Sequence, residues 1–210
     1  MLIPGDRVIE ILKDNNIDIK GVLHIGAHKC EEMHFYNTVG LVAENIIWID
    51  ALPNKVSDAK ERGIPNVYHA VVTDKDDDIV KFNVANNGES SSVLEFGTHS
   101  AEHPHVHYVS SIEQSTVTID TFAERNKLDL SQCHFWNLDI QGAELMALRG
   151  GLNAIQYAKV IYLEVNVNEL YVGCGLIGDV HAFLINQGFL LKGSEITRHG
   201  WGDALYIRKP

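Results

Sequence analysis

Short apolar runs alternate with amphipathic stretches along most of the chain. Apolar runs bounded by turn signals occupy residues 21–26, 45–50, 66–72, 134–139 and 159–164. Such runs are typical of buried strands, whereas apolar residues spaced three to four apart are typical of helices. Strands that alternate with helices predict a mostly parallel sheet with helices on both faces.

Helices and further strands complete the predicted order of elements. Helices are expected at 5–16, at 29–43, after Asp50 with Pro53 in the first turn, at 120–127, at 142–151 and at 177–187. Additional strands are expected at 79–85, 115–119, 189–196 and 203–208. The last two are separated by too few residues for a parallel crossover, so they must be antiparallel. We expect a single domain over residues 1–210, with a leading helix within 1–19.

Residues 86–114 show neither the helix periodicity nor the strand periodicity. They contain three consecutive serines and, further along, four histidines. Long irregular segments in compact domains are usually functional or disordered. We therefore expect an active-site lid, with His105 as a base and with His103 and His107 as substrate contacts. Two alternatives stay open, a polar surface loop and a zinc site, because residues 103, 105 and 107 share one face of an extended chain.

Composition narrows the choice of partners. Hydrophobic residues make up 45% of the chain and charged residues 21%, as in ordinary globular proteins. The net charge of −11 argues against nucleic acid as a partner. No apolar run approaches a membrane span, so no membrane partner is expected. The three cysteines (Cys30, Cys133 and Cys174) are far apart and fit a reducing compartment, so a cytoplasmic location is expected.

Four of the predicted strands end in polar residues. The first ends in His24-Ile-Gly26, the second in Asp50, and two later strands end in Asp139 and Glu164. Ligands of such sheets bind outside the carboxyl ends of the strands. We therefore predict a shared functional cleft at this edge.

The residues in and after the turn that follows the first strand indicate which nucleotide cofactor could bind. An acidic residue at the end of the second strand, here Asp50, accepts both hydroxyls of a ribose, although a helix N-cap ahead of Pro53 is the alternative. Dinucleotide sites need a second glycine near the pyrophosphate, and His28 occupies that position. S-adenosylmethionine fits because it carries a ribose and adenine but no phosphate. Its amino acid tail would lie over Gly26 and Ala27.

The segment Asn137-Leu-Asp-Ile-Gln-Gly-Ala-Glu-Leu-Met-Ala-Leu-Arg-Gly150 resembles the Lys-x-Asp-x-Glu-Gly-x-Glu…Leu-x-Gly signature of FkbM-type S-adenosylmethionine-dependent methyltransferases. Val-Thr-Ile-Asp120-Thr-Phe and Ser90-Ser91-Ser92-Val-Leu are similar to two further motifs of that family, and the resemblance spans about residues 20–208. It implies a Rossmann-like three-layer α/β/α sandwich and methyl transfer to oxygen. The acceptor is typically a hydroxyl of a sugar, a glycan or a polyketide-like small molecule.

The chain departs from the family pattern at five positions. His24 replaces an acidic residue, Cys30 a glycine, Asp50 a glutamate, Asn137 a lysine and Gln141 a glutamate. A histidine can still bind the amino acid tail of the cofactor, and Asp50 keeps an acceptor for ribose. Cofactor contacts are accordingly expected at His24, Gly26, Ala27, His28, Glu32, Asp50, Ala51, Val72, Ser91, Asp139, Ile140 and Gln141.

Methyl transfer to a hydroxyl benefits from a base, and Asp139 is the first candidate. Two alternatives are that Asp139 and Glu164 bind a divalent metal such as Mg²⁺, or that Asp139 caps the helix at 142–151. In the last hairpin, Trp201 and Asp203 lie on the cofactor edge and suit a sugar ring. An exposed hairpin with a packed tryptophan is equally compatible with the sequence.

Rival functions are a nicotinamide dehydrogenase, which the missing second glycine disfavours, and a cofactor-binding non-catalytic module of a larger glycan-modifying polypeptide. A homo-oligomer and a fusion to glycosyltransferase domains are both left open.

Overall fold

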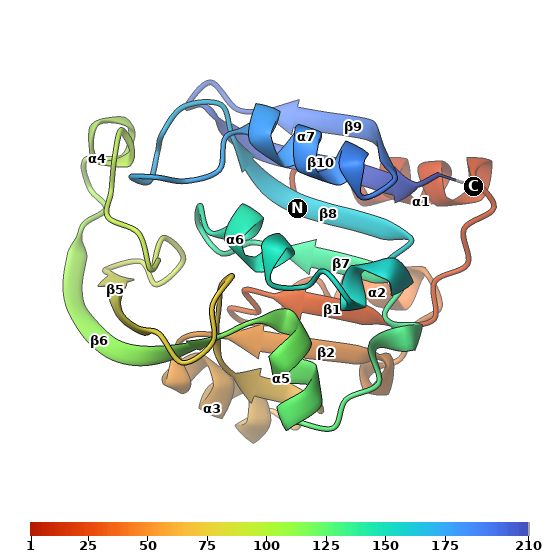
Figure 1. Cartoon of the computed structure of the whole chain (residues 1–210), viewed down its shortest axis with the longest axis horizontal. Coiled ribbons are helices and arrows are strands. Elements are labelled where there is room, and N and C mark those ends of the chain that lie inside the picture. Colours follow the sequence, from red (N-terminus) through yellow and green to blue (C-terminus); the bar gives the residue numbers. More distant parts are fainter. Residues whose placement is uncertain (210) are drawn as a thin grey trace.

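A seven-stranded sheet forms the centre of the molecule in the computed structural model, which describes residues 1–209 (Figure 1). Its strand order is β3-β2-β1-β7-β8-β10-β9. The strands, in chain order, are β1 (Val22–Ile25), β2 (Ile46–Asp50), β3 (Val67–His69), β7 (Phe135–Leu138), β8 (Val160–Asn166), β9 (Phe189–Ile196) and β10 (Trp201–Arg208). Strands β3, β2, β1, β7 and β8 are parallel, whereas β10 is antiparallel to both β8 and β9. The predicted sheet and its antiparallel hairpin are confirmed.

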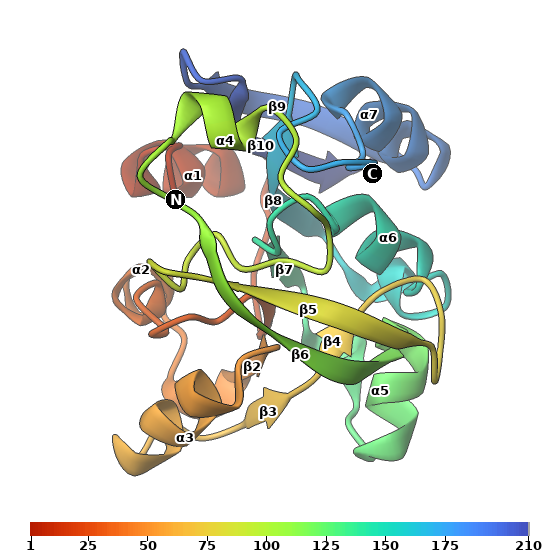
Figure 2. The ribbon, with the colours of Figure 1, turned by 90° about the vertical axis from the view of Figure 1, so that its left-hand side faces the viewer.

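Helices cover both faces of this sheet, as predicted, and Figure 2 shows the sheet between the two helical layers. The helices are α1 (Gly5–Asp14), α2 (Met33–Thr38) and α3 (Pro53–Glu61) on one face, α5 (Ile119–Arg125), α6 (Glu144–Arg149) and α7 (Ile177–Asn186) on the other, and α4 (His99–Glu102) in a loop. Successive side chains of a strand point to opposite faces. Val22 therefore packs in the core under α1 to α3, while Leu23 packs in the core under α5 to α7.

A second sheet was not predicted. It has three strands in the order β4-β6-β5, with β4 (Val71–Val72), β5 (Ile79–Ala85) and β6 (Tyr108–Val117). The predicted irregular segment 86–114 is therefore wrong at its end, because the strand starts at Tyr108. Most β6 side chains are exposed, because β6 pairs with β5 away from the main sheet, so they lack the alternation that marks a half-buried strand. The predicted strand at 66–72 is divided between two sheets at Ala70.

Helix α2 is much shorter than the predicted 29–43. His28 and Cys30 have positive φ angles of 44° and 58°, and Gly40 has 86°. Left-handed backbone at His28 and Cys30 prevents the helix from starting there, and left-handed backbone at Gly40 prevents it from continuing. The predicted proline start of α3 is confirmed, since Pro53 is its first residue.

All three cysteines are free and buried. Among residues 1–209, no helix combines the length and the apolar character needed to cross a bilayer.

Gly26 allows the first strand to turn directly over the seventh. Its φ is +94°, and a Cβ at this position would lie 1.8 Å from the carbonyl oxygen of Asp139. Both the conformation and the close approach therefore require glycine.

Replacing Gly26 with Ala is predicted to lower the free energy of unfolding by about 3–5 kcal/mol, because the backbones of two central strands must separate. Gly63→Ala is the control: Gly63 also has a positive φ, +77°, but open space around the Cβ position. It should cost only about 1 kcal/mol. Urea unfolding of both variants measures the difference, and equal losses would contradict the argument.

Candidate functional site

A cavity of about 510 Å³ opens at the carboxyl edge of the main sheet. Figure 2 views this edge, with the β5–β6 hairpin and α4 crossing in front of the strands. From the sheet, the cavity is lined by His24, Asn137, Tyr162, Glu164, Trp201 and Asp203, and Asp139 lines it just beyond the end of β7. From the loop between β5 and β6, it is lined by Asn87, Glu89, Ser90, His99, His103, His105 and Val106. The predicted acidic strand ends thus meet, with Asp50 in an adjoining pocket.

Two smaller pockets adjoin this cavity. One, of about 60 Å³, holds Asp50 and Ser91, and the other, of about 30 Å³, is mostly apolar and includes Val72 and Phe82. The first shares five residues with the large cavity: Gly26, His28, Glu89, Asp139 and Gln141. Of the twelve predicted cofactor contacts, all but Ala27 line one of the three pockets. Ala27 is buried in the core instead.

Asp50 connects the end of β2 to the turn after β1. Its Oδ2 accepts the backbone N–H of His28 at 2.7 Å, and its Oδ1 accepts that of Leu52 at 2.8 Å. The residue that caps α3 is Leu52, which makes no side-chain capping bond. Burial raises the pKa of the Asp50 carboxyl, and the two N–H donors oppose that shift.

The side-chain amide of Gln141 lies between the carboxyls of Asp139 and Glu164. Its Nε2 donates to Asp139 Oδ1 at 2.6 Å and to Glu164 Oε2 at 3.0 Å. Its Oε1 accepts the hydroxyl of Tyr171 at 2.6 Å, which directs the NH₂ group toward the two acids. Tyr171 is a site residue that the sequence analysis missed, because nothing in its local pattern marks it.

Asp139 and Glu164 differ in environment. Asp139 is exposed to the solvent of the cavity, yet desolvation by the surrounding protein raises the pKa of its carboxyl to about 6. Gln141 opposes this shift and the charge of Asp203 adds to it. Glu164 is only 7% exposed, and burial followed by the charge of Asp139 holds its pKa well above the usual range. At neutral pH the Asp139 carboxyl, with a pKa of about 6, is mostly ionised, and Glu164 is the carboxyl that takes up a proton more readily.

Glu144 stabilises the loop that carries Gln141. Its carboxyl accepts the backbone N–H groups of Ile140 at 2.8 Å and Gly142 at 3.0 Å, while burial raises its pKa to about 8. Glu144 thus binds the backbone donors just ahead of α6, and the residue at the N-cap of α6 is Ala143. The Asp139 carboxyl instead points to Gln141, so the alternative in which Asp139 caps this helix is not observed.

A neutral hydrogen-bonded triad forms part of the cavity floor. The Asn137 amide donates to the Tyr36 hydroxyl at 2.9 Å, and that hydroxyl lies 2.9 Å from His24 Nδ1. Burial lowers the pKa of His24 to about 4, so its ring is uncharged. The Tyr36 hydroxyl thus joins the Asn137 amide to the His24 ring, and the tautomer of that ring sets whether Tyr36 or Nδ1 donates. Tyr36 is a second residue that the sequence analysis missed.

The loop histidines divide into two groups. His103 and His105 line the cavity, as predicted, with ring centroids 6.2 Å apart. His107 does not line it: this residue is exposed and its backbone N–H donates to Asn86 at 3.1 Å. The structure therefore does not bring His107 to the cavity with the other two, because the chain has already turned toward β6.

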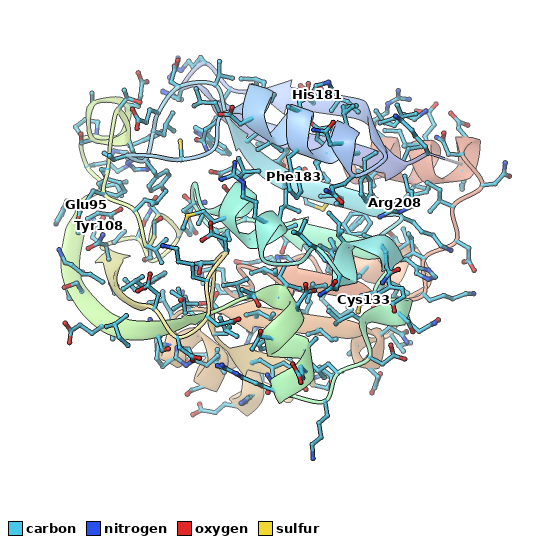
Figure 3. All side chains as sticks on the ribbon, in the orientation of Figure 1. Glu95, Tyr108, Cys133, His181, Phe183 and Arg208 are labelled. Carbon is cyan, nitrogen blue, oxygen red and sulfur yellow. The ribbon has the colours of Figure 1, made fainter. Side chains whose placement is uncertain are left out.

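His99, which was not predicted, lines the cavity with only 5% of its surface exposed. Its ring stacks on Phe96 at 4.2 Å, and Phe96 stacks on Tyr108 at 3.9 Å. Figure 3 labels Tyr108 beside Glu95 at this edge of the molecule. The aromatic stack fixes the His99 ring, whose Nδ1 has no hydrogen-bond partner in the part of the chain that the structure describes.

Trp201 and Asp203 line the cavity from β10, as predicted. Asp203 accepts hydrogen bonds from the Tyr162 hydroxyl and the backbone N–H of Leu2. Trp201 is partly buried against Leu170 and Tyr171. Both parts of the hairpin prediction, an acceptor oxygen and a flat apolar surface, thus face the same cavity.

The metal predictions find no support in the part of the chain that the structure describes. No group of three or more histidine, cysteine or acidic side chains there is arranged to hold an ion. Asp139 and Glu164 offer two carboxyls, but the N–H donors of Gln141 lie between them. A donor in that position does not suit a divalent cation, which needs oxygen ligands.

A family model and two solved protein structures are similar to this chain. A family model described as the methyltransferase FkbM domain matches residues 24–191. Magnesium protoporphyrin IX methyltransferase from Synechocystis PCC 6803, solved with bound S-adenosylmethionine, aligns at 13% identity with a TM-score of 0.48, over 98% of this chain and 78% of that chain. A methyltransferase from Aquifex aeolicus, also dependent on S-adenosylmethionine, aligns at 13% identity with a TM-score of 0.37, over 95% of this chain and 88% of that chain.

Among the curated proteins, none matches this sequence. The family model nevertheless covers most of the chain, including the turn after β1 and the loop around Gln141. The chain therefore belongs to the FkbM family of S-adenosylmethionine-dependent methyltransferases.

Proposed function

We propose that this protein transfers a methyl group from S-adenosylmethionine to a hydroxyl of a sugar or glycan. The proposal rests on one observation: two small pockets open beside one large polar cavity and share lining residues with it. The small pockets around Asp50 and Val72 and the large polar cavity join at Asp139 and Gln141. A methyl donor held on one side and an acceptor held on the other would meet beside a carboxylate.

The small pockets have the chemistry that an adenosine needs. Asp50 has carboxylate oxygens able to accept ribose hydroxyls, although each already accepts one backbone N–H. Apolar side chains that include Val72 and Ile140, together with Ala51, would pack against adenine. Ser91 borders the Asp50 pocket and would contact the same nucleoside. When bound, the cofactor supplies a methyl group activated by a sulfonium.

The large cavity begins where the amino acid tail of the cofactor would lie. Gly26 and His28 form its wall at the first turn, and His24 offers an uncharged ring from its floor. Glu32 lines the same part of the cavity and would attract the ammonium group of the tail. Gln141 would contact the cofactor from the opposite side.

Asp139 is the proposed base. Its ionised carboxyl stands at the junction of the pockets, where it would take the proton of the acceptor hydroxyl as the methyl group is transferred. Glu164, whose pKa burial raises well above the usual range, takes up a proton readily and so limits the negative charge beside Asp139. The remaining work of the site is to align the hydroxyl with the methyl group and to exclude water.

The acceptor would lie between the hairpin and the histidine loop. Trp201 offers a flat surface for a sugar ring, and Asp203 and His103 offer hydrogen-bonding groups. His105 is the alternative base, since it also lines the cavity. A His105→Ala variant that keeps most of the activity would leave Asp139 in that role.

Asp139→Asn is predicted to lower kcat by about 10²–10⁴-fold, because the amide cannot accept the hydroxyl proton. Binding of S-adenosylhomocysteine should stay within a small factor of the wild type. Asp58→Asn, on the exposed face of α3, is the matched control and should have normal activity. Near-normal turnover of Asp139→Asn would remove Asp139 as the base.

The pH dependence follows from the raised pKa of Asp139. A base must be unprotonated, so kcat/KM should hold above pH about 6 and fall as the pH decreases through that value. The positive sulfonium favours the ionised carboxyl, so kcat should fall at a lower pH than kcat/KM does. Initial rates between pH 4.5 and 8 test this order, and a flat profile would contradict it.

Asp50→Ala is predicted to weaken S-adenosylhomocysteine binding by about 1–3 kcal/mol, through loss of charged hydrogen bonds to ribose. Asp50→Asn keeps one acceptor oxygen and should lose less. Calorimetric titration measures both affinities, and thermal unfolding shows how much of the loss comes from the freed His28 and Leu52 N–H groups. Unchanged affinity in a folded Asp50→Ala protein would exclude the ribose contact.

A further inference from the structure

The large cavity is unusually poor in positive charge. Six acidic side chains line it: Glu31, Glu32, Glu89, Asp139, Glu164 and Asp203. Among residues 1–209, no lysine or arginine side chain does. The Lys55 amino group contacts the His28 ring at 2.9 Å but does not itself line the cavity. The amino group of Met1 lies 3.7 Å from Glu32 Oε1 and is paired with that carboxyl.

Three of the five histidines that line the cavity, His24, His99 and His103, do not replace the missing cations. Burial lowers the pKa of both His24 and His99 to about 4 and also lowers that of His103. These rings are uncharged at neutral pH, so they bind neutral donors and acceptors rather than anions. The cavity therefore combines carboxyls with neutral hydrogen-bonding groups.

His99 gives a second and independent indication of a neutral ligand. Only 5% of its surface is exposed, and Nδ1 has no hydrogen-bond partner among residues 1–209. Buried polar atoms are nearly always hydrogen-bonded, so this atom lacks a partner that a ligand or water would supply. The stack on Phe96 holds the ring in place at 4.2 Å. A hydroxyl of a bound acceptor fits this uncharged nitrogen.

We infer that the acceptor is a sugar without an anionic group, which excludes sugar phosphates, uronic acids and nucleotide-activated sugars. This inference rests on the proposed function. Phosphates and carboxylates in proteins are bound by arginine, lysine or the start of a helix. Among residues 1–209, no arginine or lysine side chain lines the cavity. The helix that begins beside it, α2, has Glu32 at its N-cap, and the cofactor tail would occupy that end. The part left for the acceptor is lined by carboxyls that repel an anion.

The preference for a neutral acceptor also indicates which class of reaction comes before this methylation. The donors of glycosyl transfer carry a nucleotide phosphate or diphosphate, and this cavity does not suit that group. The sugar must lose its nucleotide before it is methylated here. The class of reaction that supplies the substrate is therefore glycosyl transfer, and methylation acts on the transferred sugar.

Methyl transfer to matched acceptors tests the inference. The panel contains methyl glycosides of the common hexoses and 6-deoxyhexoses, and for each parent sugar its nucleoside diphosphate form and, where these exist, its 6-phosphate and its uronate. Amino sugar glycosides are included because an ammonium group suits the carboxyls. We expect kcat/KM for neutral and amino glycosides to exceed that for the anionic forms of the same sugar by at least about 100-fold.

Glu89→Lys reverses one charge at the exposed rim of the cavity and should reduce this discrimination about tenfold. Glu61→Lys, with the same charge change on the exposed surface of α3, should leave both activity and discrimination unchanged. His99→Phe keeps the stack but removes the nitrogen. It should raise KM for the neutral glycoside without changing S-adenosylhomocysteine affinity.

Equal or better methylation of any anionic form would overturn the inference while leaving the proposed function in place. If no glycoside of either kind is methylated by protein that binds S-adenosylhomocysteine, the sugar acceptor itself is wrong and the inference falls with it. If Glu89→Lys discriminates between neutral and anionic forms as strongly as the wild type, charge does not select the acceptor and the inference is overturned.

Discussion

The hydrogen bonds of the Gln141 amide to Asp139 and Glu164 are the interaction on which the site depends. Two carboxyls this close to one another resist ionising together, and the amide supplies both with a donor without adding charge. Tyr171 and Ser92 hold the residue, through its side-chain and backbone oxygens respectively. Its backbone has a φ of +57°, which turns the chain sharply after β7 and places the amide above the strand ends.

This bridge gives a physical meaning to a departure from the family pattern. A glutamate at position 141, which that pattern has, would place a third acid within hydrogen-bonding distance of Asp139 and Glu164. Two other departures compensate one another. His24 stands in place of an acid and Asn137 in place of a lysine, and both contact the Tyr36 hydroxyl. A negative and a positive position have thus both become neutral around one hydroxyl, which fits a cofactor site that remains intact.

The sequence predicted correctly the positions of those site residues that the sheet alone places. Parallel strands place their carboxyl ends at one edge, so the meeting of Asp139 and Glu164 and the adjoining position of Asp50 could be predicted from the strand ends. The antiparallel hairpin that brings Asp203 to the same edge followed from the short connection before it.

What the sequence could not provide depends on contacts between distant segments. The β6 strand is mostly exposed and polar, so its pattern did not differ from that of a loop. Tyr171 and Tyr36 act through partners that lie 30 and 12 residues away in the chain, Gln141 and His24. The ring of His99 lies 5.3 Å from that of Tyr171, which is 72 residues further along the chain. His107 was grouped with its neighbours by spacing alone, and the actual turn of the backbone separates it from them.

Calorimetric titration of the wild-type protein with S-adenosylhomocysteine, in the presence and absence of magnesium, tests the central claim most directly. That claim is that the pockets around Asp50 and Gln141 hold the cofactor without a metal ion. The account predicts saturable binding with one site per chain and the same affinity in both conditions. Absence of binding would contradict the cofactor site, and binding that requires magnesium would contradict the role given to the Gln141 bridge.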